Sequence, residues 1–507
     1  MQLERPCREG KKEKPIMALC RNRKMWRVFS VVVVVTFLGG CFLAISSLMK
    51  VDSNQEVEAA RNAVQHVKKE GALRRDEGRD YNSREHLKEK SNIMQIHESV
   101  AQGRNKTLKL RSGEPIELLA ALAKMKNTAN KTHAKIPGMP NMQETADWDD
   151  PATWPPPNYN LHAFYYPWYG SPEFDKTYLH WNHEILRHWS EKEAKKWPSG
   201  RWQPPGEIGA NFYPQLGPYS SRNPAVIEDH MKQLRLAGIG VISMSWYRAG
   251  LADDQGKPSD DMMPTYLDMA HKYKIKMTFH CEPYKGRSEV TFREDVRYII
   301  DTYGMHPAFY RYKFKGRLLP MFYVYDSYLT NSSDWARLFG INDELSVRNS
   351  IYDGIFLGLY LDTQHRSDIL GSLFDGFYTY FASNGFTYGS RWKNWKLLAD
   401  FAQKRDLLFV PSVGPGYVDT RVRPWNKMNT KHRSDGDYYE RSLQAAVKVK
   451  PDLISLTSFN EWHEGTQIER AVPKTFNNYT YLDYGPEGPN KYLLQTQKWA
   501  KIFKGTG

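Results

Sequence analysis

The stretch NPAVIEDHMKQLRLAGIGVISMSWY, residues 223–247, contains a helix signal followed directly by a strand signal. Asn223 is a helix-capping residue and Pro224 suits a first helical turn, so a helix is expected over 224–236. The run 239–247 then has the apolar, β-branched and aromatic composition of a buried strand. A helix that leads into a buried strand is the repeating unit of an α/β fold.

The same unit recurs along the second half of the chain. Eight strand-like runs are present, at 161–168, 239–247, 275–284, 319–328, 354–360, 376–381, 407–413 and 453–462. The helix-like segments between them are 224–236, 263–273, 292–303, 392–405 and 438–449. Eight alternations predict a (β/α)8 TIM barrel over residues 158–507. A doubly wound open sheet is the alternative, although no Gly-rich phosphate turn follows Trp168, where such a fold normally has one.

The N-terminal part of the chain predicts a membrane anchor. Residues 28–49 carry no charge and are long enough to cross a bilayer as one helix. Arg21, Arg23, Lys24 and Arg27 precede this segment, which predicts a cytosolic basic tail (1–27), a transmembrane signal-anchor (28–49) and a type II orientation. A cleaved signal peptide is the competing interpretation.

Residues 50–157 differ in character from the segments on either side. They are rich in Lys, Glu, Gln and Asn, and Tyr81 is the only aromatic residue between positions 51 and 147. Such a segment buries too little apolar surface to offset its ordering entropy, so a flexible luminal stem is expected. N-glycosylation acceptor sequences stand at Asn105, Asn130, Asn331 and Asn478.

Charge and cysteine content exclude several classes of function. Half of the net charge of +14 lies in residues 1–50, where ten Lys and Arg face three Asp and Glu. The predicted barrel is close to neutral for its size, so no nucleic-acid partner is expected. Cys281 is the one cysteine beyond residue 50, and no cysteine-based zinc or redox motif is present.

Aromatic and polar residues gather where the predicted strands end, which is where a barrel places its active site. Examples are Trp168 at the end of the first run, Tyr247 at the end of the second, and Tyr417 after the seventh. Rings pack against the C–H faces of sugars, and nearby polar side chains pair with sugar hydroxyls. An amphipathic lining with no ligand is the alternative for any one residue.

The sharpest motif is Glu461-Trp-His-Glu464, at the end of the last predicted strand. Glycoside hydrolysis needs two carboxyl groups, one to protonate the leaving oxygen and one to assist on the other side of the ring. A surface acidic loop is the alternative. The run from His463 to Gln467 approaches a His-Glu-x-x-His zinc site, but Gln467 replaces the second histidine, so no metal is expected.

Two further acidic patterns leave alternatives open. His280 and Glu282 point to the same side of a strand, either beneath a substrate or as a structural pair. Asp435-Gly-Asp437 resembles the metal–nucleotide motif of glycosyltransferases, although it reads more simply as a turn and helix cap.

Several longer stretches of the sequence resemble those of glycoside hydrolase family 99. They are residues 162–170, 212–221, 319–328, 380–389, 411–417 and 457–469, within a similar region that spans about 158–500. The resemblance implies a retaining, endo-acting α-mannosidase of the Golgi membrane that needs no cofactor. Its substrates would be glucosylated high-mannose N-glycans on glycoproteins, cut at the α-1,2 bond next to a glucose-capped mannose.

The resemblance also implies roles for individual residues. Glu461 would act as base on the substrate's own 2-hydroxyl to form a 1,2-anhydro sugar, and Glu464 would be the acid and then activate water. The residues implied in substrate binding are Tyr165, Trp168, Trp246, Tyr247, His280, Glu282, Tyr325, Tyr417 and Arg421. The loop at 248–252 departs from the family pattern, which bears on recognition of the glucose cap. A conventional retaining glycosidase of other linkage and an inactive sugar-binding relative remain alternatives.

Overall fold

The computed structural model describes residues 150 and 153–505. The N-terminal predictions lie outside the described residues: the tail 1–27, the anchor 28–49, nearly all of the stem 50–157, and the acceptors Asn105 and Asn130. In the part of the chain that is described, each helix is too short or too polar to cross a bilayer.

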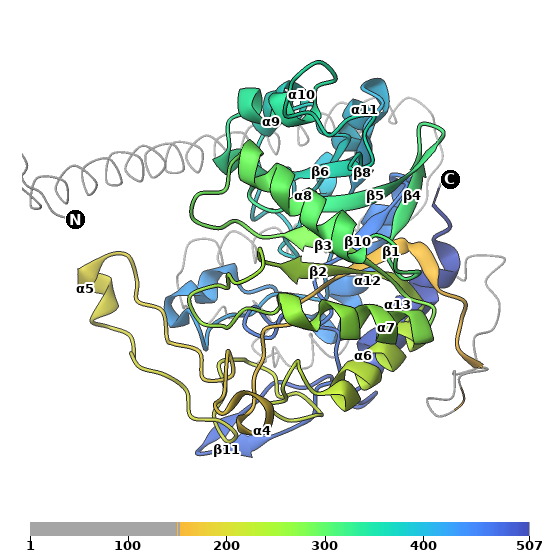
Figure 1. Ribbon diagram of the computed structural model, residues 1–507. Helices are drawn as coiled ribbons and strands as arrows, with labels where there is room; N and C mark the ends of the chain where they lie inside the picture. Colours follow the sequence, from red (N-terminus) through yellow and green to blue (C-terminus); the bar gives the residue numbers. More distant parts are fainter. Residues whose placement is uncertain (1–149, 151–152, 506–507) are drawn as a thin grey trace, which may run out of the picture. The chain divides into compact units, whose positions relative to one another are not determined.

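Parallel strands form the predicted barrel (Figure 1). In chain order they are β1 (Asn158–Tyr165), β2 (Ile239–Trp246), β3 (Lys276–Cys281), β5 (Arg317–Val324), β6 (Ile355–Leu359), β7 (Gly376–Tyr378), β8 (Leu408–Val410), β9 (Ser412–Val413) and β10 (Ile454–Leu456). Each predicted strand is present, and most are shorter than their apolar runs. β4 (Arg311–Phe314) adds an antiparallel hairpin to β5.

The barrel closes through one strand that is split in two. β8 pairs with β7, β9 pairs with β10, and only Pro411 separates β8 from β9. Proline has no N–H to donate to a sheet, so a break at this position is expected. β10 then pairs with β1, which joins the last strand to the first. The alternation of helix and strand therefore predicted the correct fold, and the open-sheet alternative is wrong.

Helices alternate with the strands around the outside of the barrel (Figure 1). They are α6 (Pro224–Leu236), α7 (Met263–Lys272), α8 (Glu289–Tyr303), α9 (Ser332–Phe339), α10 (His365–Gly371), α11 (Trp395–Lys404), α12 (Asp437–Lys448) and α13 (Lys491–Ile502). The bounds of α6 are as predicted, because Asn223 Oδ1 accepts from the Ala225 N–H at 3.0 Å and caps it.

Short elements lie in the connecting segments. They are α4 (Pro172–Asp175), α5 (Glu191–Ala194), the hairpin of β11 (Thr475–Phe476) and β12 (Tyr479–Thr480), and the 3₁₀ turns η2 (Asp260–Met262), η3 (Ser327–Leu329), η4 (Trp392–Asn394), η5 (Pro424–Asn429) and η6 (Ser434–Gly436). α5 extends away from the barrel strands (Figure 1). Asp435 and Asp437 stand at the start of α12, in agreement with the turn interpretation.

Aromatic side chains fill the barrel interior. The Phe164 ring lies 4.7 Å from His280, 5.4 Å from Tyr323 and 5.8 Å from Tyr378, centroid to centroid. All four side chains are buried. The centre is therefore a packed core that supports the strand ends, as in other barrels of this type.

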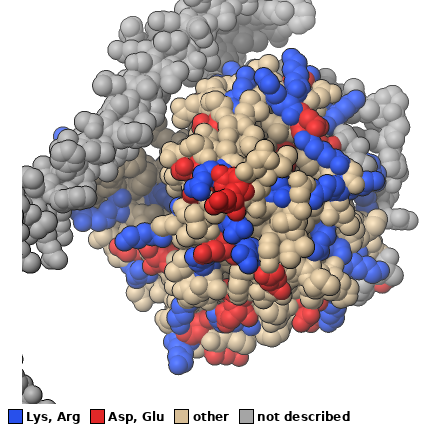
Figure 2. All heavy atoms as spheres, turned by 45° about the horizontal axis from the view of Figure 1, so that its top comes forward, with Lys and Arg blue, Asp and Glu red and all other residues tan. Residues whose placement is uncertain are grey.

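Charges of both signs are distributed over the surface. On the face in Figure 2, Lys and Arg are interspersed with Asp and Glu over a mostly uncharged background. Exposed ion pairs elsewhere in the described part of the chain include Lys196 with Glu193 at 2.7 Å and Lys315 with Asp406 at 3.0 Å. The face in view therefore carries no extended field of one sign.

We expect Phe164→Ala to lower the free energy of unfolding by about 3–5 kcal/mol, because it leaves a cavity at the centre of the packed rings. Urea denaturation of the purified protein measures this. Phe386→Ala, at a ring that is 52% exposed, is the matched control and should cost under about 1 kcal/mol. Equal losses in the two variants would contradict the packed interior.

Candidate active site

A cavity of about 370 Å³ lies at the carboxyl ends of the strands. Its lining comes from segments that follow β1, β2, β3, β5, β7, β9 and β10, where barrel enzymes place their active sites. The lining residues are Tyr166, Trp168, His180, His183, Leu186, Tyr247, Asp253, Asp254, Gln255, Glu282, Tyr325, Tyr380, Val422, Arg423, Glu461, His463 and Glu464.

The two predicted acids stand on the loop after β10, and both line the cavity. The Glu464 N–H donates to Glu461 Oε2 at 2.6 Å, and the Glu461 N–H donates to Ser458 Oγ at 2.8 Å. Gly465 takes φ +61°, and a Cβ there would lie 2.6 Å from the Val418 side chain. Glycine is therefore needed for the turn that follows the second acid.

Asn460 fastens this loop to the exit of the first strand. Its Oδ1 accepts from the Tyr166 N–H at 2.8 Å, and its Nδ2 donates to the Tyr166 carbonyl at 2.9 Å. The Tyr169 hydroxyl donates to the Asn460 carbonyl at 2.9 Å. Asn460 is buried, so water does not compete for these bonds. The sequence placed Asn460 at a strand end without showing this positioning role.

Burial changes the ionisation of the acid pair. It raises the pKa of Glu464 to about 7, against the opposing effect of the Arg423 charge, while the Asp419 charge raises it further. Burial also raises the pKa of Glu461, and the charge of Glu464 adds to that rise. A pair of this kind retains a proton near neutral pH, as an acid–base pair requires.

A third carboxylate faces the cavity from the end of β3. Glu282 Oε1 accepts from Ser245 Oγ at 2.8 Å and lies 3.1 Å from His280 Nδ1. His280 Nε2 lies 2.9 Å from the Tyr378 hydroxyl. His280 is thus beneath the cavity lining, and it orients Glu282. Glu282 lines the cavity and His280 is bonded behind it, so a role beneath a substrate stays a prediction beside the structural one.

Aromatic rings form one wall of the cavity. Trp168 stacks between Tyr166 and His180, with centroids 4.6 Å from each. The hydroxyls of Tyr166 and Tyr380 lie 2.5 Å apart. Within the described part of the chain, the buried Trp168 Nε1 has no hydrogen-bond partner. These rings line the cavity, and the indole N–H of Trp168 is left for a ligand.

The sequence analysis missed three charged residues that line the cavity, Asp253, Asp254 and Arg423. Asp253, on the loop after β2, lies 3.3 Å from His180 Nε2 and accepts from the Gly256 N–H at 2.7 Å. Arg423 pairs with the fully buried Asp419 at 3.2 Å. Asp253 lies several residues beyond the end of β2. Its only sequence signal was its place in a loop after a strand, because barrel enzymes build their active sites from these loops.

The predicted binding residues separate into three groups. Those that line the cavity are Trp168, Tyr247, Glu282 and Tyr325. Those directly beside it are His280, beneath Glu282, and Tyr417, whose hydroxyl donates to Asp419 at 2.8 Å. Those turned away from it are Tyr165, Trp246 and Arg421.

The last group corrects the prediction, and strand geometry gives the reason. Successive side chains of a strand point to opposite faces. Phe164 points into the barrel, so Tyr165 points outward and bonds to His230 of α6 at 2.7 Å. Ser245 faces Glu282, so Trp246 points outward, where its Nε1 donates to Asp260 at 2.6 Å.

Arg421 is turned away for a different reason. It lies in a loop, where its guanidinium packs over Trp202 at 3.5 Å and Tyr479 at 4.1 Å. Its Nε donates to the Ile208 carbonyl at 2.8 Å. The side chain is buried in this aromatic cage and does not face the acids.

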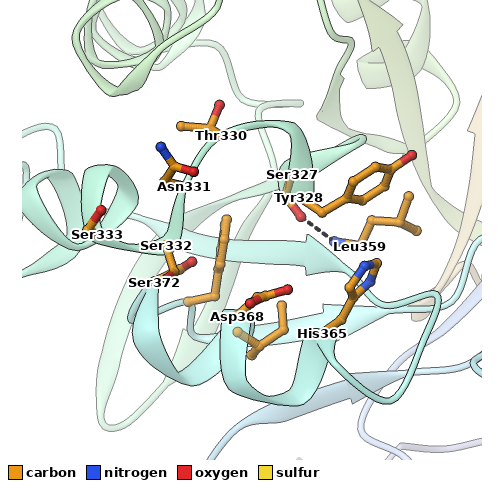
Figure 3. Close-up of a pocket in the computed structure, with 12 residues that line it drawn as sticks. Ser327, Tyr328, Thr330, Asn331, Ser332, Ser333, Leu359, His365, Asp368 and Ser372 are labelled. Carbon is orange, nitrogen blue, oxygen red and sulfur yellow. Dashed lines mark hydrogen bonds between the residues drawn. The ribbon is translucent and has the colours of Figure 1, made fainter. Parts of the chain in front are cut away.

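A second cavity, of about 380 Å³, lies between η3 and α10. Figure 3 shows Tyr328, His365 and Asp368 around it, and the Leu359 N–H donates to Ser327 Oγ at 2.9 Å. Among the described residues that line it, Asp368 carries the only carboxylate. It therefore lacks the acid pair of the first cavity, which remains the candidate active site.

Comparison with known proteins agrees with this architecture. Residues 156–505 match glycosyl hydrolase family 99. A glycoprotein endo-alpha-1,2-mannosidase of Mus musculus is 57% identical over 350 residues, which cover 69% of this chain and 76% of that protein. The Xenopus laevis protein of the same name is 55% identical over 355 residues, which cover 70% and 79%.

A solved structure matches as well. The GH99 endo-alpha-mannosidase from Bacteroides thetaiotaomicron has a TM-score of 0.63 and 44% identity, and the match covers 68% of this chain and 97% of that one. The family match spans the whole barrel, including the strand ends that form the cavity and the loop that carries both acids. This chain therefore belongs to glycosyl hydrolase family 99 and is a glycoside hydrolase.

Proposed function

We propose that this protein is an endo-acting α-mannosidase that cleaves the α-1,2 bond next to a glucose-capped mannose in N-glycans. The relatives named glycoprotein endo-alpha-1,2-mannosidase support the bond and the substrate class. The observation that carries the proposal is the acid pair, in which Glu461 and Glu464 share one cavity and are joined by a 2.6 Å hydrogen bond from backbone to carboxylate.

The first chemical step uses the substrate's own hydroxyl. Glu461 takes the proton of the 2-hydroxyl, and the freed oxygen attacks the anomeric carbon. The bond to the leaving oxygen breaks as Glu464 gives that oxygen its proton. In an α-mannoside the axial 2-hydroxyl is trans to the leaving group, so attack from the back face forms a 1,2-anhydro sugar without a protein nucleophile.

The second step reverses the proton transfers. Glu464, now ionised, takes a proton from water as the water oxygen attacks the anomeric carbon and opens the three-membered ring. Glu461 returns its proton to the 2-oxygen. Two inversions at one carbon give net retention, and both acids regain their starting state. A pKa of Glu464 near 7 suits a group that both gives and takes a proton.

The aromatic wall and Glu282 would hold the glucose-capped mannose. Trp168 has an unpartnered indole N–H at the cavity, and Glu282 presents a buried carboxylate to sugar hydroxyls. The released product would be the disaccharide Glc-α-1,3-Man. No step requires a metal or a cofactor.

We further propose that the enzyme acts in the Golgi lumen as a type II membrane protein. The uncharged segment 28–49 and the preceding Arg21, Arg23, Lys24 and Arg27 support an uncleaved anchor. Residues 50–157 would then be the stem that holds the barrel away from the membrane.

Wild-type protein incubated with a glucosylated high-mannose N-glycan should release a disaccharide, because the cut falls inside the arm. Chromatographic sizing of the fragment measures this. Glu464→Gln should lower turnover by at least about 10²-fold and leave glycan binding in place. The exposed Glu344→Gln is the control. Release of free glucose, or binding by wild type without any cleavage, would overturn the proposal.

The pH profile of kcat/KM should be bell-shaped, with activity lost above pH about 7 as Glu464 loses its proton. Arg423 lowers the pKa of Glu464, so Arg423→Gln should move the alkaline limb to higher pH, by up to about one unit. Initial rates across pH measure the shift. Arg297→Gln, at an exposed side chain, is the control and should leave the alkaline limb in place. An alkaline limb that does not move in Arg423→Gln would contradict the assignment of this limb to Glu464.

Full-length protein should stay with membranes after alkaline extraction, because one uncharged helix holds it in the bilayer. Its tail should be cut by protease added from the cytosolic side, while the barrel is protected. Western blotting of each fraction checks both outcomes. Recovery of the full chain in the alkaline supernatant would contradict the anchor.

A further inference from the structure

Three aromatic side chains meet outside the cavity, and we refer to His188, Trp189 and Trp425 as the rim platform. The Trp189 ring lies 3.9 Å from His188 and 4.8 Å from Trp425, centroid to centroid, and it meets Trp425 edge to face. Trp189 is 71% exposed, and the other two are half-buried. An exposed indole fixed by two other rings is unusual for a surface that contacts only water.

The rim platform is tied to residues that line the cavity. The Trp425 Nε1 donates to the Leu186 carbonyl at 3.2 Å, and the Leu186 N–H donates to the Val422 carbonyl at 2.9 Å. Leu186 and Val422 both line the cavity. The surface of the platform therefore continues the cavity wall. Hydrogen bonds hold together the segment with Leu186 and the segment with Val422 and Trp425.

The part of the substrate that the platform meets follows from where the platform lies. Under the proposed function the released disaccharide occupies the cavity, beside Glu282 and the acid pair. The platform lies beyond Leu186 and Val422 of the cavity lining. The glycan that extends past this lining to the platform is then the portion on the leaving-group side.

We propose that the rim platform is a distal subsite for a mannose residue of the glycan portion that remains on the glycoprotein. This rests on the proposed function. The C–H face of a pyranose ring would pack on the exposed Trp189 indole, which His188 and Trp425 hold in place. A membrane surface is the competing occupant, because Arg187, Lys192, Lys195 and Lys196 outnumber Glu191 and Glu193 in this segment. The hydrogen bonds that tie the platform to the cavity lining favour the glycan.

Two substrates with the same scissile bond test the subsite. One is the full glucosylated high-mannose glycan, and the other is a trisaccharide in which the glucose-capped mannose is linked α-1,2 to a single mannose. Trp189→Ala should lower kcat/KM about tenfold on the full glycan and change it less than about twofold on the trisaccharide. Trp189→Phe should restore most of the loss. Trp197→Ala, at a 38% exposed ring on the same loop, is the matched control.

Binding separates this inference from the proposed function. Calorimetry on full-length protein with Glu464→Gln measures affinity for each glycan without turnover, and adding Trp189→Ala should weaken only the full glycan. Equal losses on both substrates, or no loss on either, would overturn the subsite. Reduced binding of Trp189→Ala to anionic phosphatidylserine vesicles, with unchanged glycan affinity, would assign the platform to a membrane. If wild type cleaves neither glycan, the proposed function fails, and the binding comparison still decides the subsite.

Discussion

A buried hydrogen bond from the Glu464 N–H to Glu461 Oε2 sets the spacing of the two acids on which the chemistry depends. The charge of Glu464 adds to the rise in the pKa of Glu461, so repulsion between the ionised groups favours a loop in which they lie farther apart. Asn460 opposes this separation, because its side chain forms two hydrogen bonds with the Tyr166 backbone. The pairing of β10 with β1 brings these residues together. The acid geometry therefore depends on closure of the barrel.

The fold was largely predictable, since strands buried on both faces appear as continuous apolar runs. The ends of the strands were less predictable than the fold. The sixth run was predicted as 376–381, but β7 ends at Tyr378, because Tyr380 takes φ +53° and turns toward the cavity. The helices α9, α10 and α13 were not predicted. α9 and α10 have only eight and seven residues, which is too short for a 3.6-residue period to be recognised.

The site was predictable where it follows strand ends and unpredictable elsewhere. Glu461 and Glu464 stand directly after an apolar run, and their motif showed the pair. The outward direction of Tyr165 depends on register, which is fixed only once the barrel interior is chosen. Asp253 and Arg423 come from long loops without periodicity, and only tertiary packing brings them to the cavity.

The loop that supplies Arg423 illustrates how a residue without substrate contact can shape the site. Arg421 sits in a cage of Trp202 and Tyr479, a burial that a guanidinium tolerates because its faces stack on rings and its edge donates to a carbonyl. With Arg421 fixed there, Arg423 two residues on is held beside Asp419, where its charge limits the rise in the Glu464 pKa. The cage thus anchors the loop that carries the second arginine, whose charge acts on the acid.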